Sequence, residues 1–172
     1  KQTIMPNHVY NVISVEEKYA DKLKEIVEVG LCMYYKPRPK ELELTRSPVM
    51  VVSEEEYQKA LASNDGVMGL PMTAQMQSDL IKKYGFDNWY DWSLHNWETK
   101  WGVYDKEYDD GRYSFTTAWS PPGDSIIEML LKDIPDFNYN WEEEQGYGHD
   151  MVFENGKKVK DKYFETTYDY DE

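Results

Sequence analysis

Apolar residues along the chain follow two different spacings, which predict strands and helices in turn. The run 8–15 (HVYNVISV) is β-branched and aromatic and predicts a first strand. Residues 16–29 repeat apolar side chains at helical spacing and end at Gly30, which predicts a helix. Asp-Gly and Asn-Gly steps predict two hairpins among the later strands. Those strands are 101–107, 112–119, 137–143, 151–153 and 157–164.

Helix signals dominate the middle of the chain. Ser53 and Glu56 form a capping box, and Asp87 is predicted to cap a later helix. Ser120 followed by Pro121 predicts the start of the last helix, because serine caps helices and proline suits their first position. The predicted helices of this part of the chain are 53–62, 73–84, 88–97 and 120–134.

The order of these elements predicts the fold class. A proline-rich extended connection is expected over 35–48, within a largely helical segment that spans 33–97. Without that segment the order is βαββαβ, the ferredoxin-like arrangement, in which helices pack on one face of an antiparallel sheet. The sequence therefore predicts a single α+β domain over 1–172, with a mostly helical insertion, a C-terminal hairpin and an acidic tail at 165–172.

Composition narrows the classes of partner. The net charge is −14, from 33 acidic and 19 basic residues, which argues against direct binding of nucleic acid or of an anionic membrane. A protein partner with a basic surface is the positive interpretation, and simple solubility is the alternative. Aromatic residues make up 15% of the chain, so a sizeable core is expected despite a mean hydropathy of −0.82.

Acidic residues concentrate in the C-terminal third. Residues 133–156 contain seven acids and neither lysine nor arginine. Interleaved with aromatic residues, these acids are predicted to dock into a basic groove and, in the sharpest version, to imitate nucleic-acid phosphates. An ordinary solvated sheet edge with a frayed tail is the alternative. The predicted protein-binding residues are Glu142, Glu143, Glu144, Asp150, Glu154, Asp169 and Asp171.

Five tryptophans fall between residues 89 and 119. The favoured interpretation is a core in which a short helix packs on the sheet, and the alternative is a stacking platform for a small ligand. Lys100 lies between two tryptophans and is a candidate for a cation–π contact. An anionic nucleotide would also need a basic pocket, for which Lys100, Lys106 and Arg112 are candidates. The residues of this alternative ligand site are Trp92, Trp97, Lys100 and Trp119.

No catalytic or metal-binding pattern stands out. His8, His95 and His149 lack the spacing of metal ligands, and phosphate-binding, nucleophile-elbow and dinucleotide motifs are absent from the sequence. The acids at 105–110 are interpreted as a solvated turn. Cys32 is the single cysteine, which favours a reducing compartment. We therefore predict a soluble cytoplasmic protein that is not an enzyme and uses neither metal nor cofactor.

Several short motifs together resemble a known family. In chain order they are 6–11 (PNHVYN), 87–92 (DNWYDW), 96–102 (NWETKWG) and 117–122 (TAWSPP). Over about residues 5–156 they are similar to the YubB ferredoxin-like family of bacteriophage and plasmid proteins, which includes Api-type phage proteins. The resemblance implies the ferredoxin-like fold and a mobile-element origin, and it implies no established reaction. Where that family has glycine between tryptophan and threonine, this chain has Glu98.

These observations together predict a phage or mobile-element accessory protein that acts by binding. Its expected role is to inhibit a host or antiviral-defence protein in the bacterial cytosol through an acidic surface. The alternative is an aromatic-lined protein that binds a small ligand or sequesters a nucleotide signal. A third interpretation, a hydrolase, would need converging carboxylates and a bound metal.

Overall fold

The structure, a computed structural model, describes residues 7–63 and 69–166. Its backbone contacts divide the chain into two units. The sheet unit comprises residues 1–36 and 97–172, and the helical unit comprises residues 37–96. The predicted helical segment 33–97 differs from the helical unit at its ends, because residues 33–36 and Trp97 belong to the sheet unit.

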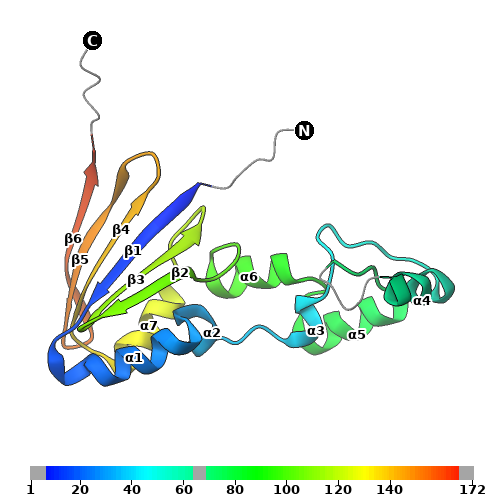
Figure 1. Ribbon diagram of the computed structural model, residues 1–172, viewed down its shortest axis with the longest axis horizontal. Helices are drawn as coiled ribbons and strands as arrows, with labels where there is room; N and C mark the ends of the chain where they lie inside the picture. The colour runs from blue at the N-terminus through cyan, green and yellow to red at the C-terminus, as the bar shows by residue number, and fades with distance from the viewer. Residues whose placement is uncertain (1–6, 64–68, 167–172) are drawn as a thin grey trace, which may run out of the picture. The chain divides into compact units, whose positions relative to one another are not determined.

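Six antiparallel strands form the sheet in the order β2-β3-β1-β4-β5-β6 (Figure 1). The strands are β1 (His8–Ser14), β2 (Tyr104–Asp109), β3 (Arg112–Ala118), β4 (Phe137–Glu143), β5 (Tyr147–Glu154) and β6 (Lys157–Glu165). The first four strands and two helices follow one another as βαββαβ, and the β5–β6 hairpin extends the sheet beyond β4. The predicted α+β, ferredoxin-like class is therefore confirmed.

Helices of the sheet unit lie on one face of the sheet (Figure 1). They are η1 (Glu17–Tyr19), α1 (Ala20–Val29), α2 (Leu31–Tyr35) and α7 (Asp124–Asp133). Leu23, Ile26 and Leu130 are fully buried, as are Val9 and Ile13 on β1. Because side chains alternate along a strand, the neighbouring β1 residues point to the opposite face, away from the helices of the sheet unit.

The helical unit is built from short helices and two extended segments. Its helices are α3 (Lys40–Glu43), α4 (Glu54–Ser63), α5 (Ala74–Tyr84) and α6 (Trp89–Trp97), whose last residue belongs to the sheet unit. Parallel bridges pair Thr45 with Leu70 and Val51 with Met72. The predicted capping box is confirmed, because Ser53 Oγ accepts from the Glu56 amide and Glu56 Oε2 accepts from the Ser53 amide.

Two predicted helix starts are wrong. Asn88, and not Asp87, caps α6, because its Oδ1 accepts a hydrogen bond from the Asp91 amide at 2.9 Å. The last helix begins at Asp124 with Gly123 as N-cap. Ser120 instead donates its hydroxyl hydrogen to the Glu98 carbonyl, a partner far away in the sequence.

Element boundaries differ elsewhere too. The first strand of the predicted 101–119 hairpin begins at Tyr104, and β5 begins at Tyr147 and not at Met151. The predicted extended connection 35–48 contains α3, stabilised at its start by a hydrogen bond from the Leu42 amide to the Pro39 carbonyl. The short helix α2 was not predicted at all, since one and a half turns leave little periodicity to detect.

Candidate functional site

The predicted tryptophan site does not form one surface. Trp97 is buried in the sheet unit, and its indole Nε1 donates to the Lys36 carbonyl at 2.8 Å. Trp92 is buried in the helical unit. Neither presents an open ring face to a ligand, so both are core residues, each of its own unit. Lys100 and Trp119, the other two members of the predicted set, lie together at the surface of the sheet unit.

A continuous series of ring contacts runs from these two residues to the start of β1. Lys100 Nζ lies 4.3 Å from the ring centroid of Trp119 and 4.8 Å from that of Trp101. Trp101 packs edge-on against Tyr104 at 6.0 Å, and Tyr104 Oη lies 2.7 Å from His8 Nδ1. We call the series the aromatic ribbon. Its members are Trp119, Lys100, Trp101, Tyr104, His8 and Tyr10.

Much of the aromatic ribbon is exposed to solvent. Trp101 is 43%, Trp119 44% and Tyr10 52% exposed. Tyrosine and tryptophan are over-represented among the residues that dominate binding energy at protein interfaces. Tyr104 is less exposed, and burial raises its pKa to about 12, with smaller contributions from Asp105, Tyr10 and Glu144. The Tyr104 hydroxyl therefore keeps its proton throughout the physiological range.

Sheet pairing and an unusual backbone conformation position the aromatic ribbon. His8 of β1 pairs with Ala118 of β3, which brings the start of one strand beside the end of the other. The Trp119 amide then donates to the Asn7 carbonyl at 2.8 Å. Trp119 has φ +70° and Glu98 has φ +56°, in the left-handed region that few non-glycine residues adopt. Such backbone outliers gather at functional sites, which draws attention to this corner of the sheet.

Two carboxylates flank the Tyr10 end of the aromatic ribbon. Glu142 of β4 is the register partner of Tyr10, so their Cβ atoms lie about 5 Å apart. Glu144 Oε2 accepts from the His8 amide at 3.0 Å, and Glu142 Oε1 accepts from the Thr166 hydroxyl at 3.2 Å. Within the described part of the chain, neither carboxylate is paired with a lysine or arginine. We call Glu142 and Glu144 the acidic rim.

The other predicted acidic residues do not join the acidic rim. Glu143 is 2% exposed, and its Oε2 accepts from the Gln145 amide at 2.7 Å, so its prediction as a docking residue is wrong. Asp150 is ion-paired with Lys160 at 3.4 Å. Glu154 ends β5, about 23 Å along the strand from Tyr147. The remaining two, Asp169 and Asp171, lie outside the described residues.

The basic residues considered for a nucleotide pocket are also apart. Lys106 Nζ donates to the Glu28 carbonyl at 2.8 Å. Arg112 begins β3, about 20 Å from Ala118 at the aromatic-ribbon end of the same strand. Lys100 is held between two indole rings. The three cations therefore do not converge on a phosphate.

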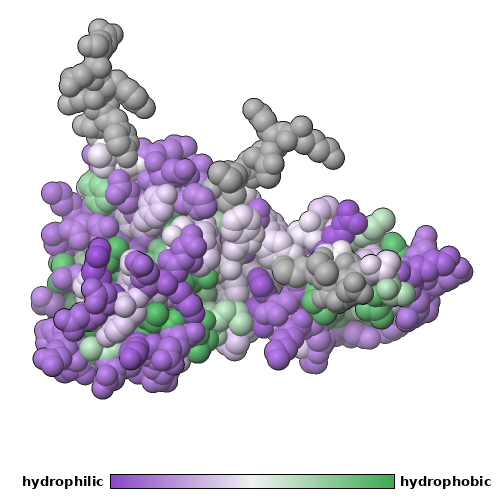
Figure 2. All heavy atoms as spheres, viewed as in Figure 1, coloured by the Kyte–Doolittle hydropathy of each residue, from purple (hydrophilic) through white to green (hydrophobic). Residues whose placement is uncertain are grey.

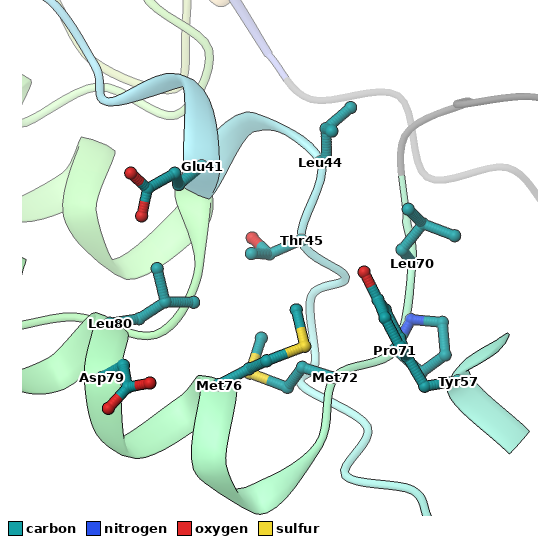
Figure 3. A pocket seen from close by; sticks show the side chains of 10 residues that line it. All are labelled: Glu41, Leu44, Thr45, Tyr57, Leu70, Pro71, Met72, Met76, Asp79 and Leu80. Carbon is teal, nitrogen blue, oxygen red and sulfur yellow. The ribbon is translucent and has the colours of Figure 1, made fainter. Parts of the chain in front are cut away.

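The helical unit contains a pocket of its own, with a volume of about 330 Å³ (Figure 3). Met76 and Leu80 project from α5 toward the segment that carries Thr45, and the carboxylates of Glu41 and Asp79 lie at the rim (Figure 3). Among the residues that the structure describes, no lysine or arginine lines it. The described lining residues are Glu41, Leu44, Thr45, Tyr57, Leu70, Pro71, Met72, Met76, Asp79 and Leu80.

Hydrophobic residues also reach the surface of the helical unit, where Figure 2 shows them between hydrophilic ones. Among the described residues of this unit, five apolar side chains are at least 40% exposed. They are Leu44, Met50, Val51, Leu61 and Ile81. In residues 7–63 and 69–166, no three His, Cys, Asp or Glu side chains converge as metal ligands would. Over the same ranges, no helix combines the length and apolar character that crossing a bilayer requires.

The βαββαβ order, the strand order and the one-sided helix layer define the sheet unit as a ferredoxin-like domain. Residues 96–172 match the family model described as the ferredoxin-like domain in Api92-like protein. The chain is also similar to the crystal structure of a protein api92 from Yersinia pseudotuberculosis, with a TM-score of 0.51. That likeness covers 95% of this chain and 100% of the other at 9% sequence identity, so it shows a shared fold alone. No curated protein matches the sequence.

Proposed function

We propose that the chain acts by binding a protein partner with a basic surface, through the aromatic ribbon and the acidic rim. The observation that carries the proposal is the placement of exposed aromatic rings beside two carboxylates that have no cationic partner among the described residues. Ring faces attract lysine and arginine side chains, and carboxylates form charge-assisted hydrogen bonds with the same groups. One segment rich in arginine or lysine satisfies both.

The resemblance to phage and plasmid proteins supports a host or antiviral-defence protein in the bacterial cytosol as that partner. A net charge of −14 would steer a basic protein toward this surface. Two carboxylates are too few to imitate a run of phosphates, so the proposal is docking without mimicry of nucleic acid. Lys100 is engaged by two indole rings, Lys106 by the Glu28 carbonyl, and Arg112 begins β3 at the end far from Ala118, which speaks against an anionic nucleotide as the ligand.

Charge reversal of the acidic rim tests the proposal. The double variant Glu142→Lys/Glu144→Lys should bind a fluorescent peptide of arginine and glycine about tenfold more weakly than the native chain. Glu154→Lys is the control for position, since it reverses a single carboxylate at the far end of β5. Raising the salt concentration from about 50 to about 300 mM should weaken native binding because ions screen exposed charges.

The natural partner is sought with the same variants. Proteins from a lysate of the natural host that the native chain and Glu154→Lys retain, and the double variant loses, should be basic when identified by mass spectrometry. Peptide binding that ignores both salt and the double variant would overturn the proposal.

A second candidate, small-ligand binding, is favoured by the pocket of the helical unit. Its volume of about 330 Å³ is within the range of small-molecule sites. Thioethers, aliphatic groups and a tyrosine line it, and the carboxylates among its described lining residues are Glu41 and Asp79. Such a lining suits a neutral or cationic apolar molecule. Phenethylamine should raise the thermal unfolding midpoint more than 3-phenylpropanoate does, and equal effects would reject the candidate.

A further inference from the structure

The six-stranded sheet is wider than the two core helices can cover. Neighbouring strands lie about 4.8 Å apart and a helix is about 10 Å across, so two helices cover about four strands. Those four are the strands of the βαββαβ core, whose helices are α1 and α7, while β5 and β6 extend the sheet past β4. On the helix side of the sheet, the β5–β6 hairpin therefore adds a strip about 10 Å wide, which is the width of one more helix. We call this strip the lane.

A groove of about 410 Å³ follows this lane between α7 and β6. Ile127 and Leu131 of α7 form one wall, and Tyr139, Met151 and Phe153 of β4 and β5 form the floor. Ile127, Tyr139, Met151 and Phe153 are each at most 8% exposed, so they form a closed base, and the half-buried Leu131 is the aliphatic side chain that a partner can still cover. The groove belongs entirely to the sheet unit.

One end of the lane carries a second set of aromatic residues. The His149 ring stacks on Trp141 with centroids 5.2 Å apart, and Tyr163 packs edge-on against His149 at 5.5 Å. Tyr163 is 51% and Tyr147 37% exposed. Asp161 Oδ1 lies 2.6 Å from His149 Nδ1, which fixes the orientation of the ring on the indole. Rigid, partly exposed aromatic groups are suited to anchoring a partner.

Charge along the groove has one prevailing sign. Asp124 and Glu128 are on the α7 wall. On the β6 wall, Lys158 Nζ lies 2.6 Å from Asp161 Oδ2, so the lysine found among the described lining residues is already neutralised. The hydrogen bond from Lys158, followed by the one from His149, lowers the pKa of Asp161, which stays ionised at neutral pH. The two walls of the groove therefore present net negative charge.

We propose that this groove binds an amphipathic α-helix of a protein partner. Its apolar stripe packs on Leu131 and on the exposed rings of Tyr147 and Tyr163, and its basic residues face Asp124 and Glu128. The eight residues of β5 extend over about 26 Å, the length of a helix of about 17 residues. This surface is on the opposite face from Tyr10 and the acidic rim, so the inference does not depend on the function proposed above.

Two synthetic amphipathic helices test the inference. Both have a leucine stripe and a length of about 17 residues, and their polar faces carry either lysine and arginine or glutamate. The basic helix should bind the full chain in a fluorescence anisotropy titration, and the acidic helix should not. Nuclear magnetic resonance shifts should then map to the groove residues and leave the aromatic ribbon unchanged.

Two variants and a control complete the test. Leu131→Gln and Glu128→Lys should each weaken binding of the basic helix about tenfold. Glu107→Lys, at the opposite edge of the sheet, should change it less than about twofold. Thermal unfolding of each variant verifies that it is folded. Equal binding of the two helices, no binding of either, or shifts at Tyr10 instead of Met151 would overturn the proposal. Concentration-dependent dimers that Leu131→Gln disperses would assign the groove to a second copy of the chain and overturn it too.

Discussion

Asn11 is the polar centre of the buried face of the sheet. It is 1% exposed, and its Nδ2 donates to Thr117 Oγ1 at 3.1 Å and to the Val9 carbonyl at 3.0 Å. Its Oδ1 accepts from the hydroxyl of Tyr139 at 2.6 Å. Burial holds the pKa of Tyr139 well above its usual range, so the hydroxyl acts as a donor at every physiological pH. The three side chains link β1, β3 and β4 within the hydrophobic layer.

Removing members of this network should have coupled effects. Tyr139→Phe is expected to lower the free energy of unfolding by about 1–2 kcal/mol, because it leaves Asn11 Oδ1 buried without its donor. Asn11→Ala should lower the free energy of unfolding by about 2–4 kcal/mol. It leaves the hydroxyls of Thr117 and Tyr139 buried without their partner, and it opens a cavity. Urea unfolding of both single variants and of the double variant measures their coupling, expected at about 1 kcal/mol. Strictly additive losses would contradict a shared network, and Tyr163→Phe at the surface is the control.

Some residues of the candidate site were predicted from the sequence and others were not. Glu142, Glu144, Lys100 and Trp119 were predicted as binding residues and lie in or beside the aromatic ribbon. Glu143 was included wrongly, although strand alternation already indicated that adjacent residues point to opposite faces. His8, Tyr10, Trp101 and Tyr104 were missed as a group. Their ring contacts depend on the pairing of β1 with β3 and of β2 with β3, which no local pattern reveals.

Among the elements, turns with local signals were predicted well and those with distant partners were not. Asp110 and Gly111 have φ of 43° and 78°, and Asn155 and Gly156 have 52° and 76°. These left-handed pairs follow from residue type alone. The start of α7 was misplaced because Ser120 bonds to Glu98 and not to its own helix. The start of β5 was missed because glycine, here Gly148, is unfavourable in strands. In the structure a glycine is needed at this position, because a Cβ would lie 1.9 Å from the Trp141 carbonyl oxygen.

The connection after α6 explains a departure from the resembled family. Glu98, at the position where the resembled family has glycine, has φ +56°. A glycine is favoured at such a position for its backbone freedom, without any need for a ligand to approach closely. The Glu98 carboxylate lies next to Gly123, the N-cap of α7. A Cβ added to Gly123 would lie 1.7 Å from Glu98 Oε2. A carboxylate near a helix N-terminus is favourable.

A pair of variants separates the backbone from the carboxylate. Glu98→Gly and Glu98→Ala both remove the charge near α7, and only the alanine variant retains a Cβ in the left-handed region. The glycine variant is therefore expected to be about 1 kcal/mol more stable than the alanine variant in urea unfolding. The opposite order would mean that the flexibility of glycine in the unfolded chain outweighs the relief of strain. Ala60→Gly is the control. Residue 60 lies within α4, where the native alanine should be more stable than glycine, because glycine is unfavourable inside a helix.

At the scale of the whole molecule, buried tyrosines make stability depend on alkaline pH. Burial raises the pKa of Tyr113, Tyr139 and Tyr35, and it raises that of Tyr104 to about 12. Each group binds its proton more tightly in the folded chain, so its contribution to stability is complete below the unfolded pKa of about 10. That contribution is lost as pH rises through the raised folded values.

Alkaline titration should therefore couple ionisation to unfolding. Tyrosinate absorbance is expected to rise in two phases, with exposed side chains ionising from about pH 10 and buried ones only as circular dichroism reports unfolding. Tyr139→Phe should reduce the amplitude of the second phase. Ionisation of every tyrosine in one step, with native circular dichroism throughout, would contradict the assigned burial.

The sheet unit should fold without the helical unit. Trp97 Nε1 bonds to the Lys36 carbonyl at 2.8 Å, so the two chain ends that flank residues 37–96 are held close together. About four residues of glycine and serine, which span up to about 13 Å, should join them without strain. The shortened chain is expected to unfold cooperatively and to bind the basic amphipathic helix, because the groove belongs to the sheet unit. The same deletion combined with Trp97→Ala should unfold at lower temperature, since it removes the side chain that fills this junction. A shortened chain with no cooperative transition would show that residues 37–96 contribute to the core and not only to a separate unit.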